Sequence, residues 1–143
     1  MAKHDPVVQK KLTQGPRNAT YTSADIQNDM LHVMAEAVRN KITADVNKAG
    51  IYSIMADETR DCSKKEQLSI VVRYVDVESA NIHEHFLAFT EADTLNAEDL
   101  SAYILQTLDT FKLDPAAIVS QGYDGASAMS GHCWGVQQRI KQV

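Results

Sequence analysis

Between Ser23 and Gly50, apolar residues recur at steps of three to four positions, and this spacing predicts one long amphipathic helix. The apolar stripe comprises Ile26, Met30, Val33, Met34, Ala37, Val38, Ile42 and Val46. Ser23 is suited to cap the start of this helix, and Gly50 is suited to end it. The preceding residues are polar and interrupted by Gly15 and Pro16, so we expect residues 1–22 to form a loop or arm.

After Gly50 the period of the pattern changes from helical to extended. Residues 51–56 form a short, nearly continuous apolar run, which is typical of a strand buried on both faces. Residues 57–65 read as a charged turn, residues 68–75 as a second strand rich in β-branched side chains, and residues 83–90 as a third, alternating strand. Short connections between consecutive strands predict an antiparallel meander.

A second helical pattern follows the three predicted strands, with Asn96 placed to cap it. Its apolar face comprises Leu100, Tyr103, Ile104, Leu108 and Phe111. Residues 117–120 predict a fourth strand, and the crossover that leads to it is long enough for this strand to lie parallel to the first. From about Ala126 the pattern is helical to the end. The predicted class is therefore α/β, with the order α-β-β-β-α-β-α.

Composition and charge narrow the possible functions of the chain. Its 143 residues fit one domain, which we place at residues 23–143 after the arm formed by residues 1–22. The net charge of −5 excludes binding of nucleic acid through bulk positive charge, so such binding would need metal ions or a local basic patch. The sequence has neither a membrane-spanning apolar run nor a secretory start, so we expect an intracellular protein that is not secreted.

Two aspartates are the strongest candidates for chemistry. Asp57 follows the first predicted strand, and Asp124 comes shortly after the fourth. Open α/β sheets place their sites at the carboxyl ends of parallel strands, so neighbouring strands would bring these carboxylates together. Paired carboxylates are hard oxygen ligands for a divalent cation such as Mg²⁺, although aspartate is also common in turns for structural reasons. Spacing alone leaves both explanations open.

Other residues that carry reactive groups favour structural explanations. Gly122 and Gly125 could cradle a phosphate, but the phosphate-binding glycine motifs are absent. His83 and His85 alternate along a predicted strand, which favours a solvated face over a pair of metal ligands. Packing or solvation is also the preferred explanation for Cys62, Lys64, Lys65, Ser127, His132, Cys133 and Trp134.

Four blocks of sequence, in order, resemble the transposase core of the hAT superfamily, and more narrowly its branch of zinc finger MYM-type protein 1-like proteins. The blocks are Arg17–Ser23 (RNATYTS), Ala56–Ile70 (ADETRDCSKKEQLSI), Arg73–Val75 (RYV) and Gly122–Gly131 (GYDGASAMSG), the last followed by Gly135–Gln137 (GVQ). The resemblance runs from about Arg17 to the last residue. It implies a partial ribonuclease-H-like fold, which agrees with the order of elements predicted above.

The resemblance also implies roles for the two acids. Asp57 and Asp124 match the first two residues of an Asp-Asp-Glu metal site that supports Mg²⁺-dependent DNA strand transfer. The family's Glu lies on a helix far downstream, so it has no counterpart before Val143, and Ala128 stands where relatives carry Asn. We therefore expect a non-catalytic, transposase-derived domain. The alternatives are a domesticated module that binds protein or DNA without cutting, an active transposase fragment, and a remnant without a selected role.

The predicted sheet has a consequence for self-association. The fourth strand would lack the further strand expected beside it, and an unpaired edge is a template for pairing with another chain. We therefore expect either a marginally stable monomer or association of copies of this chain through that edge.

Overall fold

A computed structural model describes residues 5–16, 23–60, 65–92, 94, 96–123 and 135–142. By their internal contacts, the residues form two compact units, Met1–Val38 and Arg39–Val143. The boundary between the units falls within one long helix. In the residues that the structure describes, no helix is both long enough and apolar enough to cross a membrane.

The first unit contains a helix that the sequence analysis assigned to a loop. Helix α1 spans Pro6–Gln14, and the Asp5 carboxylate caps it by accepting hydrogen bonds from the backbone N–H groups of Val7 and Val8, at 2.8 and 3.2 Å. Proline is favoured at the first helical position because its ring already fixes φ and it has no N–H group to satisfy. The prediction was wrong here because Gly15 and Pro16 outweighed this start signal.

The long helix α2 confirms the amphipathic pattern that predicted it. It spans Ala24–Ala49 and therefore begins in the first unit and ends in the second. Gly50 follows its last turn with φ of +77°, and its N–H donates to the Val46 carbonyl at 3.1 Å. Only glycine adopts this left-handed conformation without strain, so Gly50 ends the helix as predicted.

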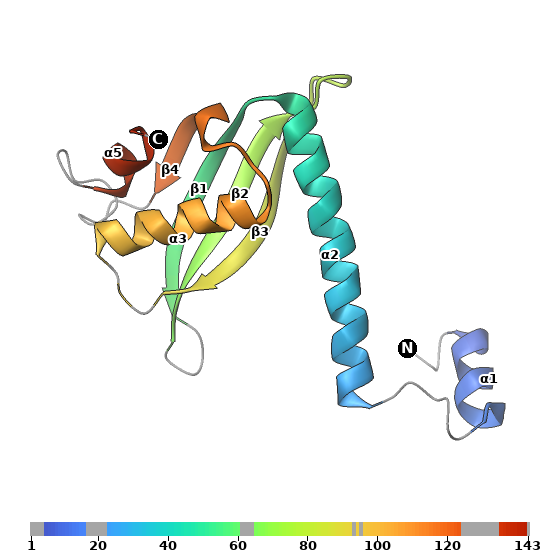
Figure 1. Cartoon of the computed structure of the whole chain (residues 1–143). Coiled ribbons are helices and arrows are strands. Elements are labelled where there is room, and N and C mark those ends of the chain that lie inside the picture. Colours follow the sequence, from blue (N-terminus) through green and yellow to red (C-terminus); the bar gives the residue numbers. More distant parts are fainter. Residues whose placement is uncertain are drawn as a thin grey trace. The chain divides into compact units, whose positions relative to one another are not determined.

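The second unit is built on one mixed sheet of four strands (Figure 1). The strands are β1 (Tyr52–Arg60), β2 (Glu66–Val75), β3 (Ile82–Glu91) and β4 (Ile118–Tyr123), in the spatial order β3-β2-β1-β4. Strands β1, β2 and β3 form an antiparallel meander, and β4 lies parallel to β1. The predicted meander and the predicted parallel fourth strand are both confirmed.

Strands β1 and β4 extend further than the sequence pattern indicated. Strand β1 continues through residues 57–60, which the sequence predicted as a turn, because these residues pair with β2 as far as Arg60↔Glu66. Strand β4 likewise continues through residues 121–123, beyond the predicted end at residue 120. Pairing with neighbouring strands here overrides the turn preference of the charged and glycine residues. Asp57 therefore lies inside a strand rather than after one.

Strand β3 contains a bulge opposite the middle of β2. Phe86 pairs with Val71 and Ala88 pairs with Ile70, so Leu87 is an additional residue on β3. A bulge leaves one residue without its ladder partners. Here the Leu87 carbonyl accepts a hydrogen bond of 3.2 Å from Nε of Arg39, at the start of the α2 segment in the second unit.

Two further helices complete the second unit. Helix α3 spans Ala97–Thr110, and the Asn96 side chain accepts from the Asp99 N–H at 2.9 Å, which confirms the predicted cap. A single turn of 3₁₀ helix, η2, covers Pro115–Ala117, and the short helix α5 covers Val136–Ile140. The helix predicted from Ala126 lies, up to residue 134, outside the described residues.

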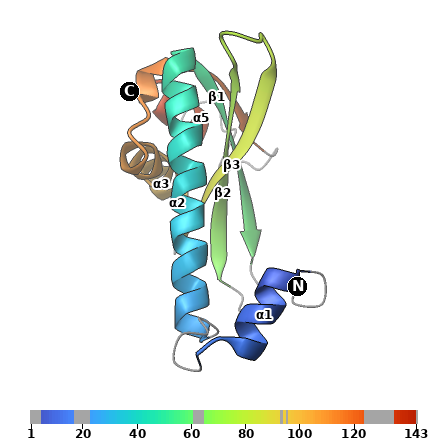
Figure 2. The same ribbon diagram turned by 90° about the vertical axis from the view of Figure 1, so that its right-hand side faces the viewer.

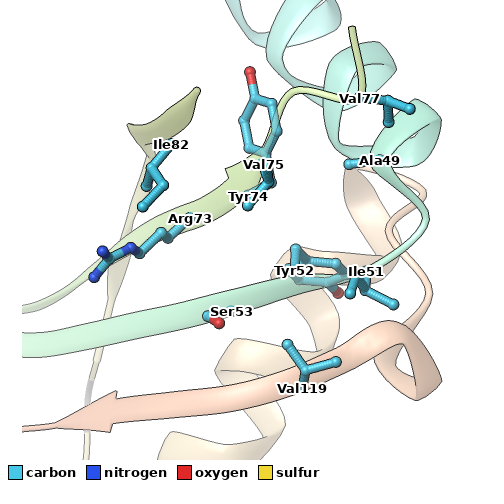
Figure 3. A pocket seen from close by; sticks show the side chains of 10 residues that line it. All are labelled: Ala49, Ile51, Tyr52, Ser53, Arg73, Tyr74, Val75, Val77, Ile82 and Val119. Atoms are coloured by element: carbon cyan, nitrogen blue, oxygen red, sulfur yellow. The ribbon is translucent and has the colours of Figure 1, made fainter. Parts of the chain in front are cut away.

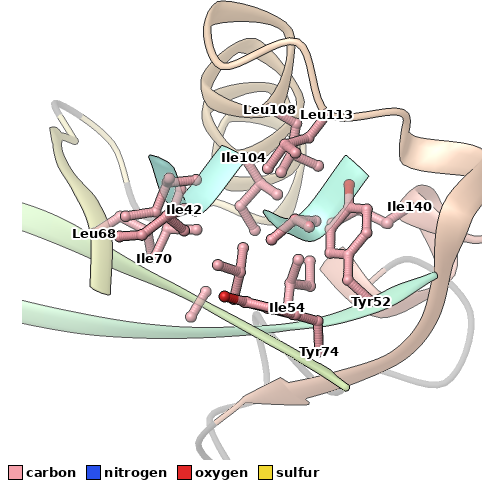
Figure 4. Packing of buried hydrophobic residues seen from close by; sticks show 14 of the residues in the cluster. Ile42, Tyr52, Ile54, Leu68, Ile70, Tyr74, Ile104, Leu108, Leu113 and Ile140 are labelled. Carbon is pink, nitrogen blue, oxygen red and sulfur yellow. The ribbon is translucent and has the colours of Figure 1, made fainter. Parts of the chain in front are cut away.

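The hydrophobic core lies between one face of the sheet and the helices (Figure 4). In Figure 2, α3 and α5 lie on the same side of this sheet. The core comprises Ile42, Val46, Tyr52, Ile54, Ala56, Leu68, Ile70, Val72, Tyr74, Leu87, Leu100, Ile104, Leu108, Leu113, Val136 and Ile140. On β1 the intervening residues Ser53 and Met55 are only half-buried. Burial of β1 on both faces was therefore predicted wrongly for the part of the chain that the structure describes.

Candidate functional site

Asp57 lies on the face of β1 that points away from the core. Its neighbour Ala56 is buried against the core, and successive side chains of a strand point to opposite faces. Asp57 pairs with Ser69 of β2, and the Ser69 hydroxyl donates a hydrogen bond of 3.1 Å to the Asp57 backbone carbonyl. The Asp57 side chain is exposed, and its carboxylate forms no hydrogen bond or ion pair with any described residue. This carboxylate is therefore available to a ligand.

The parallel pairing of β1 with β4 relates the two predicted site residues. Met55 pairs with Gly122 and Ala56 pairs with Tyr123, so the register ends one residue before each aspartate. Asp124 itself lies outside the described residues. The strand arrangement on which the two-aspartate hypothesis depends is confirmed, whereas the position of the Asp124 carboxylate stays a prediction.

A shallow hollow of about 380 Å³ lies beside Asp57. It is lined by Met55, Ala56, Asp57, Ser69, Gly122 and Tyr123. A Cβ atom at Gly122 would lie 3.1 Å from Cγ of Met55, which is closer than a side chain ordinarily allows. Glycine thus keeps the surface of β4 low next to Asp57, and a larger residue there would fill part of the hollow.

Tyr123 borders the hollow on the β4 side. Its hydroxyl donates to Oε1 of Gln121 at 2.7 Å, and burial raises the pKa of the Tyr123 phenol above its ordinary value. The phenol is therefore neutral at physiological pH and serves as a fixed hydrogen-bonding group rather than as a negative charge. At this edge, Asp57 is the exposed acidic side chain that the described residues supply.

Lys65, which directly precedes β2, is engaged in an ion pair. Its Nζ lies 2.5 Å from Oε1 of Glu91. This pairing agrees with the preferred explanation of Lys65 as part of a solvated surface.

The donor set at this edge fits a hard divalent cation in kind but supplies only part of a site. No group of three or more His, Cys, Asp or Glu side chains able to hold a metal occurs among the residues that the structure describes. Asp57 provides one carboxylate without a protein partner, which is the ligand type that Mg²⁺ prefers. A complete site would need Asp124, as the sequence predicted.

Several other sequence candidates lie outside the described residues and stay predictions. These are Cys62, Lys64, Gly125, Ser127, His132, Cys133 and Trp134. Gly122 is described, and it lies on β4 rather than in a phosphate-binding loop.

A second hollow lies at the opposite end of β1 (Figure 3). This groove of about 310 Å³ is mainly apolar, with Ile51, Val75, Ile82 and Val119 among the residues that line it. Its charged lining residue, Arg73, pairs with Glu84 at 3.3 Å. The residues that line this groove include no carboxylate or imidazole, so the groove itself supplies no metal ligand of these kinds.

Two residues at the Asp57 end were not singled out for chemistry in the sequence. Ser69 interrupts an apolar strand with a hydroxyl, and period-two alternation places it on the face opposite Leu68 and Ile70. The sequence therefore indicated the face on which Ser69 lies. It did not indicate the register of β1 and β2 that brings Ser69 beside Asp57. Tyr123 lies next to Asp124 in sequence, and only the longer β4 shows that it belongs to the sheet.

Comparison with known proteins shows which family this chain resembles. A family model described as "ZMYM1/FAM200, RNase-like domain" matches residues 1–135. A human protein named "52 kDa repressor of the inhibitor of the protein kinase" is 31% identical over 91 residues, which are 62% of this chain. The mouse protein of the same name is 29% identical over 91 residues. The matched region spans 12% of the length of each relative.

Proposed function

Because the chain belongs to the family of ZMYM1/FAM200 RNase-like domains, we propose that it is a transposase-derived domain that binds a divalent cation without cutting DNA. Asp57 and Asp124 are the proposed ligands, and Mg²⁺ is the proposed cation. The domain's role is then that of an interaction module built on an inherited metal-binding scaffold.

The observation that carries this proposal is the parallel register of β1 and β4. The last paired residues, Ala56 and Tyr123, each directly precede one of the two aspartates. Neighbouring parallel strands lie about 4.8 Å apart, which is within the span over which two carboxylates share a cation. Repulsion between two such carboxylates is relieved when a cation binds.

In an enzyme of this type, bound Mg²⁺ would activate the attacking hydroxyl and stabilise the leaving oxygen of a DNA phosphodiester. The residues of this chain contribute position rather than proton transfer. Ser69 binds the Asp57 backbone, which holds the carboxylate at its place on the strand. Gly122 keeps the approach to that carboxylate open on the β4 side.

Charge favours a non-catalytic role over DNA cleavage. The net charge of −5 opposes the approach of a polyanion, and Lys65 is paired with Glu91. The human relative is named a repressor, a word that describes an interaction rather than bond cleavage. Both observations support a module that keeps the scaffold and acts by binding.

Thermal unfolding in a titration of Mg²⁺ or Mn²⁺ tests the cation site. A ligand that binds only the folded state stabilises it by about 1.4 kcal/mol when its free concentration is ten times the dissociation constant. We expect this stabilisation in the wild type and its loss in both Asp57→Asn and Asp124→Asn. Asp109→Asn is the matched control, because Asp109 is an exposed aspartate on α3, away from the sheet edge.

Absence of a metal effect in the wild type, or an equal loss in the Asp109→Asn control, would contradict the cation site. Incubation with supercoiled plasmid and Mn²⁺ tests the second half of the proposal. We expect no nicking. Nicking by the wild type that disappears in both Asp57→Asn and Asp124→Asn would show an active nuclease instead.

A further inference from the structure

A stacked group of three aromatic rings lies on β2 and β3, away from Asp57. His83 and His85 alternate on β3, so their side chains share one face of the sheet, and in the ladder they pair with Tyr74 and Val72 of β2. The two imidazole centroids are 5.7 Å apart, with an angle of 13° between the ring planes. The Tyr74 ring lies 5.5 Å from that of His83 and 5.9 Å from that of His85.

Both imidazoles are partly exposed, and their polar atoms are uncommitted. Neither ring forms a hydrogen bond or an ion pair with another residue in the described part of the chain. Tyr74 is buried and belongs to the hydrophobic core. Burial therefore holds the Tyr74 ring in place, and the two imidazoles, with uncommitted nitrogens, pack beside it on the edge strand β3.

We infer that His83 and His85 form a two-imidazole binding site for a late first-row divalent metal such as Ni²⁺, Cu²⁺ or Zn²⁺, with water filling the other coordination positions. This site is separate from Asp57, and it holds a different class of ion. Imidazole nitrogen suits these metals, whereas Mg²⁺ prefers oxygen ligands.

The geometry of the pair is close to what one shared ion requires. With metal–nitrogen bonds of about 2.1 Å, two imidazoles on a tetrahedral ion have ring centroids about 5.3 Å apart. The observed 5.7 Å needs a closure of a few tenths of an ångström and a rotation of the rings about their side-chain torsions. The strand backbone fixes the spacing of the two Cβ atoms, so rotation of the side chains is what must bring one nitrogen of each ring to the same ion.

The Tyr74 ring limits the positions that the two imidazoles can adopt. Stacking on Tyr74 restricts the two rings in the free protein, and both rings must turn from this stacked arrangement to bind one ion. Asp45, whose charge acts on Tyr74, is itself paired with Lys41 at 3.2 Å. The proposed ligands of the ion are therefore the imidazoles themselves.

Titration with Ni²⁺ alone, followed by calorimetry and thermal unfolding, tests the site. Ni²⁺ is the probe because, unlike Cu²⁺, it does not oxidise the two cysteines of the chain. We expect one tight site per chain in the wild type and an affinity at least about tenfold weaker in His83→Asn and in His85→Asn, since even outer-shell partners of a metal are worth that much.

His32→Asn is the matched control, because His32 is an exposed, isolated histidine on α2 whose side chain lies 3.9 Å from Glu36. We expect this variant, and Asp57→Asn, to bind Ni²⁺ like the wild type. Equal weakening in His32→Asn, or unchanged binding in both β3 variants, would overturn the inference.

Nuclear magnetic resonance of the wild type gives a readout that needs no variant to fold. Ni²⁺ below stoichiometric amounts should broaden the ring signals of His83 and His85 before those of the other histidines. Broadening that begins at another histidine would contradict the site. Because Mg²⁺ does not compete for imidazole, failure of this site leaves the Asp57 proposal untouched, and the reverse also holds.

Discussion

The two faces of the sheet differ in what their side chains do. On one face, Ile54, Ile70 and Val72 are fully buried beneath the helices. On the other face, Phe86 and Phe89 are 45% and 57% exposed, and Asp57 is exposed as well. Residues that are adjacent on the same strands thus have opposite environments. One face supplies the burial that folds the domain, and the other leaves side chains available for ligands and partners.

The two candidate metal sites also lie on different faces of the sheet. Asp57 lies on the exposed face, where its carboxylate meets solvent. The His83–His85 pair lies on the same face as the core, but at the edge strand, where cover by the helices is incomplete. Burial of neighbours orders the imidazoles, whereas hydrogen bonding to the backbone orders the strand at Asp57. The two sites therefore depend on different parts of the structure for their geometry.

The largest expected effect is on the covered face. Ile54→Ala removes buried methyl groups and leaves a cavity, so we expect a loss of about 2–5 kcal/mol in the free energy of unfolding. Met55→Ala is the matched variant on the opposite face, where the side chain is only half-buried, and we expect a loss of about 1 kcal/mol or less. Urea unfolding measures both. Equal losses would contradict the difference between the faces.

A smaller effect is expected at the end of β1 where the core reaches the loop before β4. The Tyr52 hydroxyl donates to the Asp114 carbonyl at 3.1 Å, so Tyr52→Phe should cost about 1 kcal/mol at neutral pH. Burial, and secondarily the charge of Asp114, raise the pKa of Tyr52 in the folded state. Stability from this group is therefore complete below the unfolded tyrosine pKa of about 10 and falls as pH rises above it.

Tyr52→Phe should accordingly lose less stability than the wild type between about pH 10 and 12, the range just above that unfolded value. Denaturant unfolding at several alkaline pH values measures the two slopes. Part of the decrease in unfolding free energy with pH should persist in Tyr52→Phe, because burial also raises the pKa values of Tyr74 and Tyr123. Identical slopes in the two proteins would show that Tyr52 does not carry this pH dependence.

The smallest effect on stability is expected at the β4 edge, where we propose that copies of the chain associate. Val119 is an exposed residue of this edge strand, so Val119→Lys should change the free energy of unfolding by less than about 0.5 kcal/mol. A lysine on an edge strand opposes pairing with another chain. We therefore expect the wild type, but not this variant, to form dimers with increasing concentration in sedimentation experiments.

Val77→Lys is the control for that experiment, because Val77 is equally exposed but lies in the turn between β2 and β3. It should associate like the wild type. A wild type that stays monomeric at high concentration would remove the proposed edge contact.

The sequence predicted those elements whose signals are local. The spacing of apolar residues and the caps at Ser23, Gly50 and Asn96 located α2 and α3 within one or two residues. The meander followed from short connections, and the parallel fourth strand from a long one. The ends of β1 and β4 were missed because pairing with a neighbour, rather than local preference, extends them.

The candidate site was predictable only in part. Asp57 was recognisable as a residue at a strand edge, but Ser69 reaches it through a cross-strand register that no local pattern reveals. The histidine pair was visible as an alternation that favoured a solvated face. Its stacking with Tyr74 depends on the pairing of β2 with β3, so the contact between Tyr74 and the imidazoles could not be predicted from the sequence.

The bulge at Leu87 has a consequence for how β3 tolerates change in length. The additional residue shifts the phase of the strand by one, so that Phe86 and Phe89 share a face although they are three positions apart, with ring centroids 4.7 Å apart. Arg39 holds this phase shift by binding the Leu87 carbonyl. Deletion of Leu87 would therefore restore regular alternation and leave Phe86 and Phe89 on their present face. It would also remove a fully buried side chain from the core and leave the Arg39 guanidinium without its acceptor.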